Sequence, residues 1–306
     1  MNAAVPRVTT IPTERRFPLN LHKADRSIRD LYETAKVSRW NPETDLPWTE
    51  HAFAGVDAAA LDAARRVWSR RAWVEYTGMT ETPALLIRFC LELNRESDPK
   101  YFLTVRNTEE AWHVESFHRY AEACGGYVDK PDDPAWEPVF NRTLYRDALD
   151  AEVSIDAYVA AHCAFVDGLE HELAQAWRAN AREPLARAVL ERCLPDYERH
   201  AAFGWLYAER RAPAMDATLR ARVGQALARH VAEVEFAGYH CVALATRIDT
   251  TRERADLARA AGAGLGTATA DEEVAIFRDW IGRSRARFAE LGLELPPVAH
   301  PRLGTL

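Results

Sequence analysis

The chain has 306 residues, of which 48% are hydrophobic and 28% charged, the balance of a globular protein with a sizeable core. Its formal net charge of −7 argues against nucleic acid or an anionic membrane as the main partner, because both attract basic proteins. The sequence contains no apolar run of the roughly 18 residues that a membrane-spanning helix needs.

The cysteines and the N-terminus indicate the compartment. Five cysteines are scattered along the chain without a Cys-x-x-Cys pair. The first twenty residues, MNAAVPRVTTIPTERRFPLN, lack the apolar core of a secretory signal. We therefore expect a protein of the reduced cytoplasm.

The predicted secondary structure is almost entirely helical. Residues 1–55 are rich in proline and turns and hold one short helix candidate, RSIRDLYETAKVSRW. From about residue 57, segments rich in Ala, Leu, Arg and Glu alternate with breaks at Gly and Pro. The expected helices are 57–77, 80–95, 101–124, 138–149, 153–180, 184–211, 216–247 and 270–292. No period-2 apolar run predicts a strand.

Three local signals refine these boundaries. Cys124-Gly125-Gly126 is typical of a helix end, and Thr269 with Glu272 forms a capping-box pattern at the start of the last helix. Pro195 is expected to kink the helix 184–211.

Long helices with short connections predict an all-α helical bundle. No linker is long or polar enough to separate two domains. We expect an N-terminal arm (1–55), one helical domain (56–295) and an irregular C-terminal tail (296–306).

Two short motifs suggest a metal site. In TEEAWH, Glu110 and His113 are three residues apart, and in DYERH, His200 follows Tyr197 at the same spacing. Residues three apart share one face of a helix, so a Glu and an imidazole can bind the same ion. In two-metal bundles two helices contribute Glu-x-x-His and two contribute a single carboxylate.

An acid precedes each motif at nearly equal distance. Glu81, in TETPALLI, lies 29 residues before Glu110, and Asp167, in FVDGLEHEL, lies 30 residues before Tyr197. Each interval fits one helix, a turn and a returning helix. Asp167 has apolar neighbours, and a buried acid is costly unless it is paired or binds a metal. The quasi-repeat therefore predicts a two-metal centre with one expected Glu replaced by Tyr197.

Three interpretations of Tyr197 are open. Tyr197 binds the metal as a phenolate, because a bound cation can lower the pKa of a phenol. Alternatively, Glu170 or His171 supplies the missing ligand, whereas Asp196 points about 100° away on the helix. In the third interpretation the second metal is absent, and the protein binds one metal or none. Arg199 is expected either to pair with a carboxylate or to be solvated.

The same segments carry a family resemblance. NTEEAWHVESFHRY and DYERHAAFGW resemble the two Glu-x-x-His segments of ferritin-like di-iron carboxylate proteins. FVDGLEHEL and TETPALLI resemble the segments that supply the other two carboxylates, and LYETAKVSRWNPETDLPW is similar to an N-terminal arm of such proteins. The resemblance covers roughly residues 28–211. This superfamily includes ribonucleotide reductase small subunits, bacterial multicomponent monooxygenases, aldehyde-deformylating oxygenases and arylamine N-oxygenases.

The resemblance implies a ferritin-like four-helix bundle with extra C-terminal helices and a centre that activates dioxygen. Its cofactor would be iron, two ions per chain, with manganese or mixed Fe/Mn as variants. The implied metal ligands are Glu81, Glu110, His113, Asp167 and His200, with Tyr197 as the altered, catalytic position, and we expect Glu170 as the sixth ligand in place of the missing Glu.

The implied activity is that of a non-haem oxidase or oxygenase that oxidises a small organic substrate, by hydroxylation, N-oxygenation or a related reaction. The electron donor is unknown, and a homodimer is expected from family likeness alone. The alternative is a non-catalytic or mono-metal binding protein.

Overall fold

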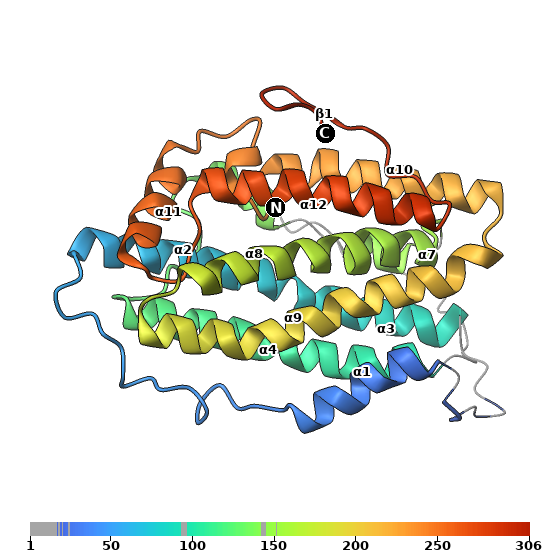
Figure 1. The fold of residues 1–306 in the computed structure, drawn as a ribbon, viewed down its shortest axis with the longest axis horizontal. Helices are drawn as coiled ribbons and strands as arrows, with labels where there is room; N and C mark the ends of the chain where they lie inside the picture. Colours follow the sequence, from blue (N-terminus) through green and yellow to red (C-terminus); the bar gives the residue numbers. More distant parts are fainter. Residues whose placement is uncertain are drawn as a thin grey trace, which may run out of the picture.

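The computed structural model describes residues 17, 19, 21–23, 25–92, 97–141, 145–150 and 152–306. The N-terminal segment, for which we predict no secretory signal, lies largely outside these residues. The end of the expected helix 80–95 also lies outside them. The predicted all-α fold is confirmed (Figure 1). No helix in the described ranges is long and apolar enough to cross a membrane.

Twelve α-helices are found among the described residues. In chain order they are α1 (Arg26–Val37), α2 (Ala58–Tyr76), α3 (Gly78–Glu92), α4 (Asp98–Ala123), α5 (Glu137–Phe140), α6 (Tyr145–Leu149), α7 (Ile155–Tyr158), α8 (Asp167–Asn180), α9 (Pro184–Arg211), α10 (Ala217–Glu233), α11 (Thr251–Ala263) and α12 (Ala270–Glu290). A π-helix, η2 (Val159–Val166), joins α7 to α8. The short strands β1 (Ala299–His300) and β2 (Gly304–Thr305) pair antiparallel near the C-terminus.

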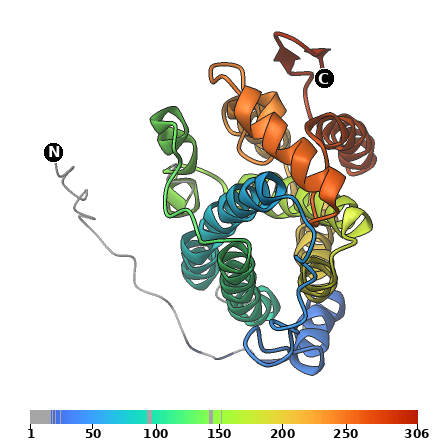
Figure 2. The same ribbon diagram turned by 90° about the vertical axis from the view of Figure 1, so that its left-hand side faces the viewer.

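Two helical layers form the bundle. The α2–α3 segment runs antiparallel to α4, and α8 runs beside α9, as the end-on view in Figure 2 shows. The main core lies between them and includes the fully buried side chains of Trp68, Phe117, Tyr120, Phe165 and Leu169. Helices α10 and α12 form an outer layer, in which α10 packs on α7 and η2 and α12 packs on α8 (Figure 1).

Two of the three predicted helix signals are confirmed. Thr269 and Glu272 form both hydrogen bonds of the capping box at the start of α12. Cys124 caps α4, and Gly125 and Gly126 follow with φ of 121°. Helix α9 continues through Pro195 without interruption.

The N-terminal arm is fixed to the bundle by charged groups. Arg29 Nε donates to Asp98 Oδ1 at 2.7 Å, which attaches α1 to the start of α4. Further along the arm, Trp40 Nε1 donates to the buried carboxylate of Asp196 in α9 at 2.9 Å. The arm therefore reaches the interior of the bundle.

The expected helix 216–247 is wrong in its second half. Helix α10 ends at Glu233, and two 3-10 turns, Glu235–Ala237 and Val242–Leu244, follow. Gly238, at φ 86°, adopts a left-handed conformation, in which a right-handed α-helix cannot continue. Phe236 and Leu244 are buried by these turns. The prediction also missed α11.

Two other expected helices differ in detail. The segment 138–149 contains only the short helices α5 and α6. The segment 153–180 is helical, but its middle is the π-helix η2. A π-helix has hydrogen bonds between residues five apart instead of four, and short π-helical turns are frequent at functional sites. Here it lies immediately before Asp167. The C-terminal tail, expected to be irregular, forms the β1–β2 hairpin.

Candidate metal site

The predicted acids meet at one buried cavity. A cavity of about 30 Å³ lies between α2–α3, α4, α8 and α9 and is lined by Glu75, Glu81, Arg106, Glu110, Asp167, Glu170 and His200, among others. This volume accommodates one or two groups the size of a water molecule. The structure thus brings together five of the six predicted metal ligands, and His113 joins them through Glu75.

Each motif histidine is held by a carboxylate at its Nε2 atom. His113 Nε2 donates to Asp196 Oδ2 at 3.2 Å, and His200 Nε2 is 2.9 Å from Glu109 Oε2. Carboxylates in this position fix the tautomer and the orientation of a metal-binding imidazole. They leave Nδ1 of each ring as the nitrogen suited to a metal.

Arg199 links these two carboxylates. Its guanidinium is buried and donates to Glu109 Oε1 at 2.6 Å and also to Asp196 Oδ1. Of the two expected roles, pairing with carboxylates is therefore the one observed. Its partners orient the histidines and are not the predicted metal ligands.

Glu75 enters the site from the end of α2. Its Oε2 atom lies 3.3 Å from His113 Nδ1, and its Oε1 accepts a hydrogen bond from the Tyr197 hydroxyl. Burial opposes ionisation of His113, but contacts with Cys193, Asp196 and Glu75 raise its pKa well above the usual value. The imidazole therefore donates to both carboxylates, and a metal ion bound at Nδ1 would replace the proton that faces Glu75.

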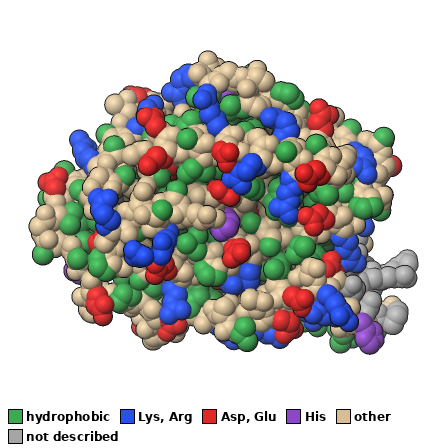
Figure 3. All heavy atoms as spheres, in the orientation of Figure 1, with side chains coloured by type: hydrophobic (Ala, Val, Ile, Leu, Met, Phe, Trp, Pro, Cys, Tyr) green, Lys and Arg blue, Asp and Glu red, His purple; other side chains and the backbone are tan. Residues whose placement is uncertain are grey.

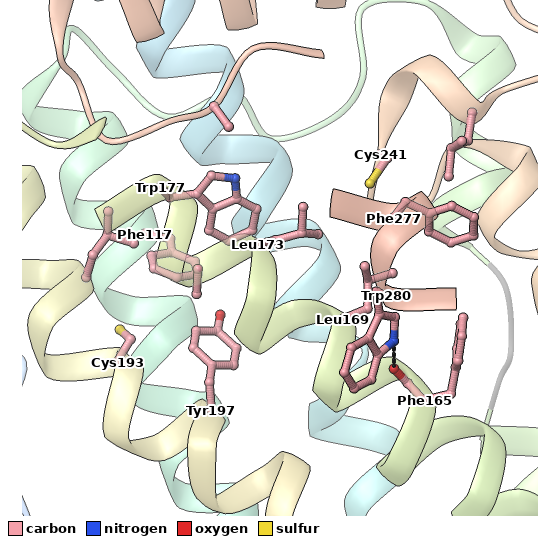
Figure 4. Close-up of a cluster of buried hydrophobic side chains, with 14 of the residues drawn as sticks. Phe117, Phe165, Leu169, Leu173, Trp177, Cys193, Tyr197, Cys241, Phe277 and Trp280 are labelled. Carbon is pink, nitrogen blue, oxygen red and sulfur yellow. Dashed lines mark hydrogen bonds between the residues drawn. The ribbon is translucent and has the colours of Figure 1, made fainter. Parts of the chain in front are cut away.

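Tyr197 is a neutral phenol in this arrangement. Burial, followed by the nearby charge of Glu75, raises the pKa of Tyr197 well above its usual value. The ring packs 4.7 Å from that of His113. Figure 4 shows Tyr197 near Phe117 and Cys193 in the apolar core. Tyr197 donates a proton to Glu75 in a hydrogen bond and offers no anionic oxygen.

Arg106 occupies the other end of the cavity. It lies one turn before Glu110 on α4, and its Nη2 atom is 2.8 Å from Asp167 Oδ1 and 3.2 Å from Glu110 Oε1. Its Nη1 donates to Thr82 Oγ1 at 2.5 Å. A single guanidinium group thus joins α3, α4 and α8.

Several carboxyl oxygens at the cavity have no hydrogen-bond partner among the described residues. These atoms are Glu81 Oε1, Glu110 Oε2 and Asp167 Oδ2. Burial raises the pKa of Glu81 to about 8 and that of Glu110 to about 7, and it raises that of Asp167 well above the usual value. Buried carboxyl groups of this kind stay protonated near neutral pH unless a bound cation favours the ionised form.

Gly78 makes room for the Glu110 carboxyl group. A β-carbon on Gly78 would lie 2.6 Å from Glu110 Cδ and 2.7 Å from its Oε1. Gly78 follows Glu75 by three residues at the break between α2 and α3. The glycine therefore allows Glu110 to approach the same helix end that carries Glu75.

The donor side chains are not gathered around a single point. Among the described residues, no group of three or more His, Cys, Asp or Glu side chains is gathered as it would be around a metal ion. The side facing α2 nevertheless offers carboxylates of Glu75 and Glu110 with the imidazole of His113, ligands suited to iron or manganese. On this same side, Tyr197 is a hydrogen-bond donor to Glu75, and at the other end of the cavity Arg106 already pairs with Asp167.

Glu170 lines the cavity and pairs with a histidine of the cavity wall. Its Oε1 lies 3.1 Å from His240 Nε2, and Glu235, on the other side of that ring, accepts from His240 and from His230 Nε2 at 3.0 Å. The ring of His171, the other candidate substitute, contacts the Gln175 amide instead.

Two apolar cavities continue from the site towards α11. The first, of about 40 Å³, shares Glu75, Glu170 and His240 with the metal-site cavity and is otherwise lined by side chains such as Phe117 and Trp177. The second, of about 60 Å³, shares Val67, Arg70, Val242 and Leu257 with the first. The three cavities share lining residues and extend from the carboxylates towards α11.

The fold is that of the ferritin-like proteins related to ribonucleotide reductase small subunits. No family model and no curated protein matches the sequence. Solved structures of R2-like ligand-binding oxidases are similar over most of their length.

Three of these structures illustrate the likeness. An R2-like ligand-binding oxidase after photoconversion is 17% identical with a TM-score of 0.67, covering 90% of this chain and 96% of its own. A point mutant of such an oxidase with an Mn/Fe cofactor is 17% identical, with a TM-score of 0.66 and coverages of 87% and 95%. Another point mutant, with an Fe/Fe cofactor, is 18% identical, with a TM-score of 0.65 and coverages of 87% and 94%. At these identities the likeness establishes the fold.

Sequence reasoning missed Glu75, Glu109 and Arg106. Arg106 carried a detectable signal, because it lies four residues before Glu110 on the same helix face. Glu109 stands beside Glu110 and points towards His200 instead. Glu75 had no signal, since its approach depends on how α2 meets α4.

Proposed function

We propose that the protein is a metal-dependent oxidoreductase that uses dioxygen to oxidise a small organic molecule. The observation that carries this proposal is the cavity lined by carboxylates with partnerless buried oxygens, beside two histidines whose Nε2 atoms are held by carboxylates. The R2-like ligand-binding oxidases of the same fold, with Mn/Fe or Fe/Fe cofactors, support the choice of iron or manganese.

The ligands we propose are Glu75, Glu110 and His113; Asp167 and His200 line the cavity beside them. When bound, iron or manganese supplies the electrons that reduce dioxygen. The chain itself orients the imidazoles through Asp196 and Glu109, and it excludes water with the surrounding apolar core.

The cavities beside the site suggest the chemistry of the substrate. Their walls combine apolar side chains such as Val67 and Phe117 with charged groups such as Arg71 and Glu273, so we propose a small organic molecule that carries both apolar and polar groups. Hydroxylation, N-oxygenation, desaturation and oxidative cleavage are the reactions to assay. The face in Figure 3 mixes acidic and basic side chains, and we propose neither nucleic acid nor a membrane as partner.

The test is metal binding followed by dioxygen uptake. Protein loaded with Fe(II) or Mn(II) without oxygen is analysed for metal and then mixed with aerated buffer in an oxygen electrode. We expect bound metal and dioxygen consumption, both strongly reduced in Glu110→Ala and His113→Ala. His171→Ala is the matched control, because its ring lies outside the cavity. Full metal load in both site variants would refute the proposal.

A non-catalytic binding protein is the second candidate. It is favoured by the lack of a gathered three-ligand group among the described residues. Such a protein would bind no iron or manganese, or a fixed zinc ion, and would consume no dioxygen in the same experiment.

A further inference from the structure

The guanidinium of Arg106 lies where bundle proteins of this pattern place a cation. Its Nη2 atom contacts Asp167 Oδ1 at 2.8 Å and Glu110 Oε1 at 3.2 Å, so it connects carboxylates from α8 and α4. In the two-metal pattern, inward carboxylates of facing helices surround the metals in the same way. Arg106 therefore performs the electrostatic task of a bound ion.

The position of Arg106 is fixed. Its side chain is only 8% exposed, and Nη1 donates to Thr82 Oγ1 at 2.5 Å. A guanidinium group keeps its positive charge even when buried, unlike a lysine or histidine. Moving it out of the cavity would leave Asp167 and Glu110 without this partner, at a cost typical of a broken buried ion pair.

The charges at the cavity leave room for one metal ion. Glu170 is paired with His240, which leaves the carboxylates of Glu75, Glu81, Glu110 and Asp167. A bound metal ion favours the ionised form of all four carboxyl groups, and Arg106 then offsets one of their four negative charges. One divalent or trivalent ion offsets most or all of the remainder, whereas two divalent ions with Arg106 would exceed it in a low-dielectric site.

The hydrogen bond of Tyr197 also argues against a second metal ion. A second ion would need a carboxylate at this position of the Tyr-x-x-His motif, and the phenol instead donates to Glu75. Relative to the two-metal pattern, Tyr197 in place of Glu removes one negative charge, and Arg106 adds one positive charge.

We propose that the protein binds a single metal ion, through Glu75, Glu110 and His113, and that Arg106 is a permanent cation in place of a second ion. This inference rests on the proposed function, because it assumes that the cavity binds a redox metal. It assigns Glu75 as a ligand and gives Arg106 a role that the two-metal pattern lacks.

The test is the number of metal ions per chain. Full-length protein is equilibrated without oxygen with excess Mn(II), desalted, and analysed by elemental mass spectrometry against amino-acid analysis. We expect close to one ion per chain, with the resolved electron paramagnetic resonance signal of an isolated Mn(II) ion. Two ions per chain, or the signal of a coupled pair, would overturn the inference and leave the proposed function standing. No bound metal would overturn both.

Variants test Arg106 directly. The double variant Arg106→Leu/Tyr197→Glu removes the cation and restores the missing carboxylate, so we expect its metal content to rise to about twice that of the wild type. Tyr197→Glu alone should remain near one ion, since Arg106 still occupies the second position. Arg106→Lys keeps the charge and should also remain near one.

Folding of each variant is checked by circular dichroism and thermal melting. If the double variant does not fold, Tyr197→Glu and Arg106→Lys still decide the question together with the wild type. A second ion in Tyr197→Glu would show that Arg106 does not exclude it and would overturn the inference.

Discussion

Glu273 shows how burial changes a single residue. It lies on α12 with 3% of its surface exposed, and it accepts a hydrogen bond from Trp177 Nε1 at 3.3 Å. Its Oε2 atom has no partner among the described residues. Burial raises the pKa of Glu273 to about 7, although Arg71 lowers it. Because the folded-state pKa exceeds the unfolded value, the stability linked to Glu273 is full below about pH 4.3 and is lost as the pH rises through 7.

Glu273→Gln should therefore become more stable relative to the wild type between about pH 4 and pH 7. The unfolding free energy of the variant minus that of the wild type should rise by about 3 kcal/mol over this pH range, because glutamine removes the cost of burying a carboxylate. Urea unfolding of both proteins at several pH values measures it. Glu290→Gln, exposed on the same helix, is the control and should follow the wild type. A pH-independent difference for Glu273→Gln would contradict the assignment.

At the scale of elements, one glycine sets the distance between two helices. Gly204 of α9 packs against the π-helix η2, and an added β-carbon would lie 2.1 Å from the Cys163 carbonyl carbon and 2.2 Å from Ala164 N. These are backbone atoms that cannot rotate aside. The close contact fixes η2 immediately before Asp167, so the packing of α9 also positions a cavity carboxylate.

Gly204→Ala should lower the free energy of unfolding by about 2–3 kcal/mol, because overpacking forces the helices apart. Gly282→Ala on α12 is the matched control, since its β-carbon would meet no described atom within 4 Å. That variant should gain roughly 0.5–1 kcal/mol from the higher helix propensity of alanine. Chemical denaturation compares the two, and equal effects would show that the contact with η2 is unimportant.

At the scale of the molecule, the C-terminal hairpin holds the segment that closes the apolar cavities. His300 Nε2 donates to Leu244 O at 2.9 Å, and Arg302 Nη2 donates to Ala243 O and Ala245 O at 2.7 Å each. The adjacent Val242 lines both apolar cavities. Residues more than 50 positions apart in the chain thus cooperate to shape the route to the site.

Removal of residues 297–306 should destabilise the protein by roughly 2–4 kcal/mol, because the carbonyl groups lose their donors and Leu244 loses its cover. Arg302→Met removes only the guanidinium bonds and should cost about half as much. Differential scanning calorimetry measures both. If the truncated protein has the same melting temperature as the wild type, the hairpin does not stabilise the η5 segment Val242–Leu244.

By itself, the sequence determined the helical class, the long helices α2, α4 and α9, and the placement of Glu110, His113, Asp167 and His200 near one another. Helical periodicity and equal spacing are local properties, and they survive folding unchanged. The tertiary structure alone decided that α10 ends at Glu233 and that Glu75 and Arg106 enter the cavity. Both depend on contacts between distant segments, namely the burial of Phe236 and Leu244 and the meeting of α2 with α4 at Gly78, which no local pattern records.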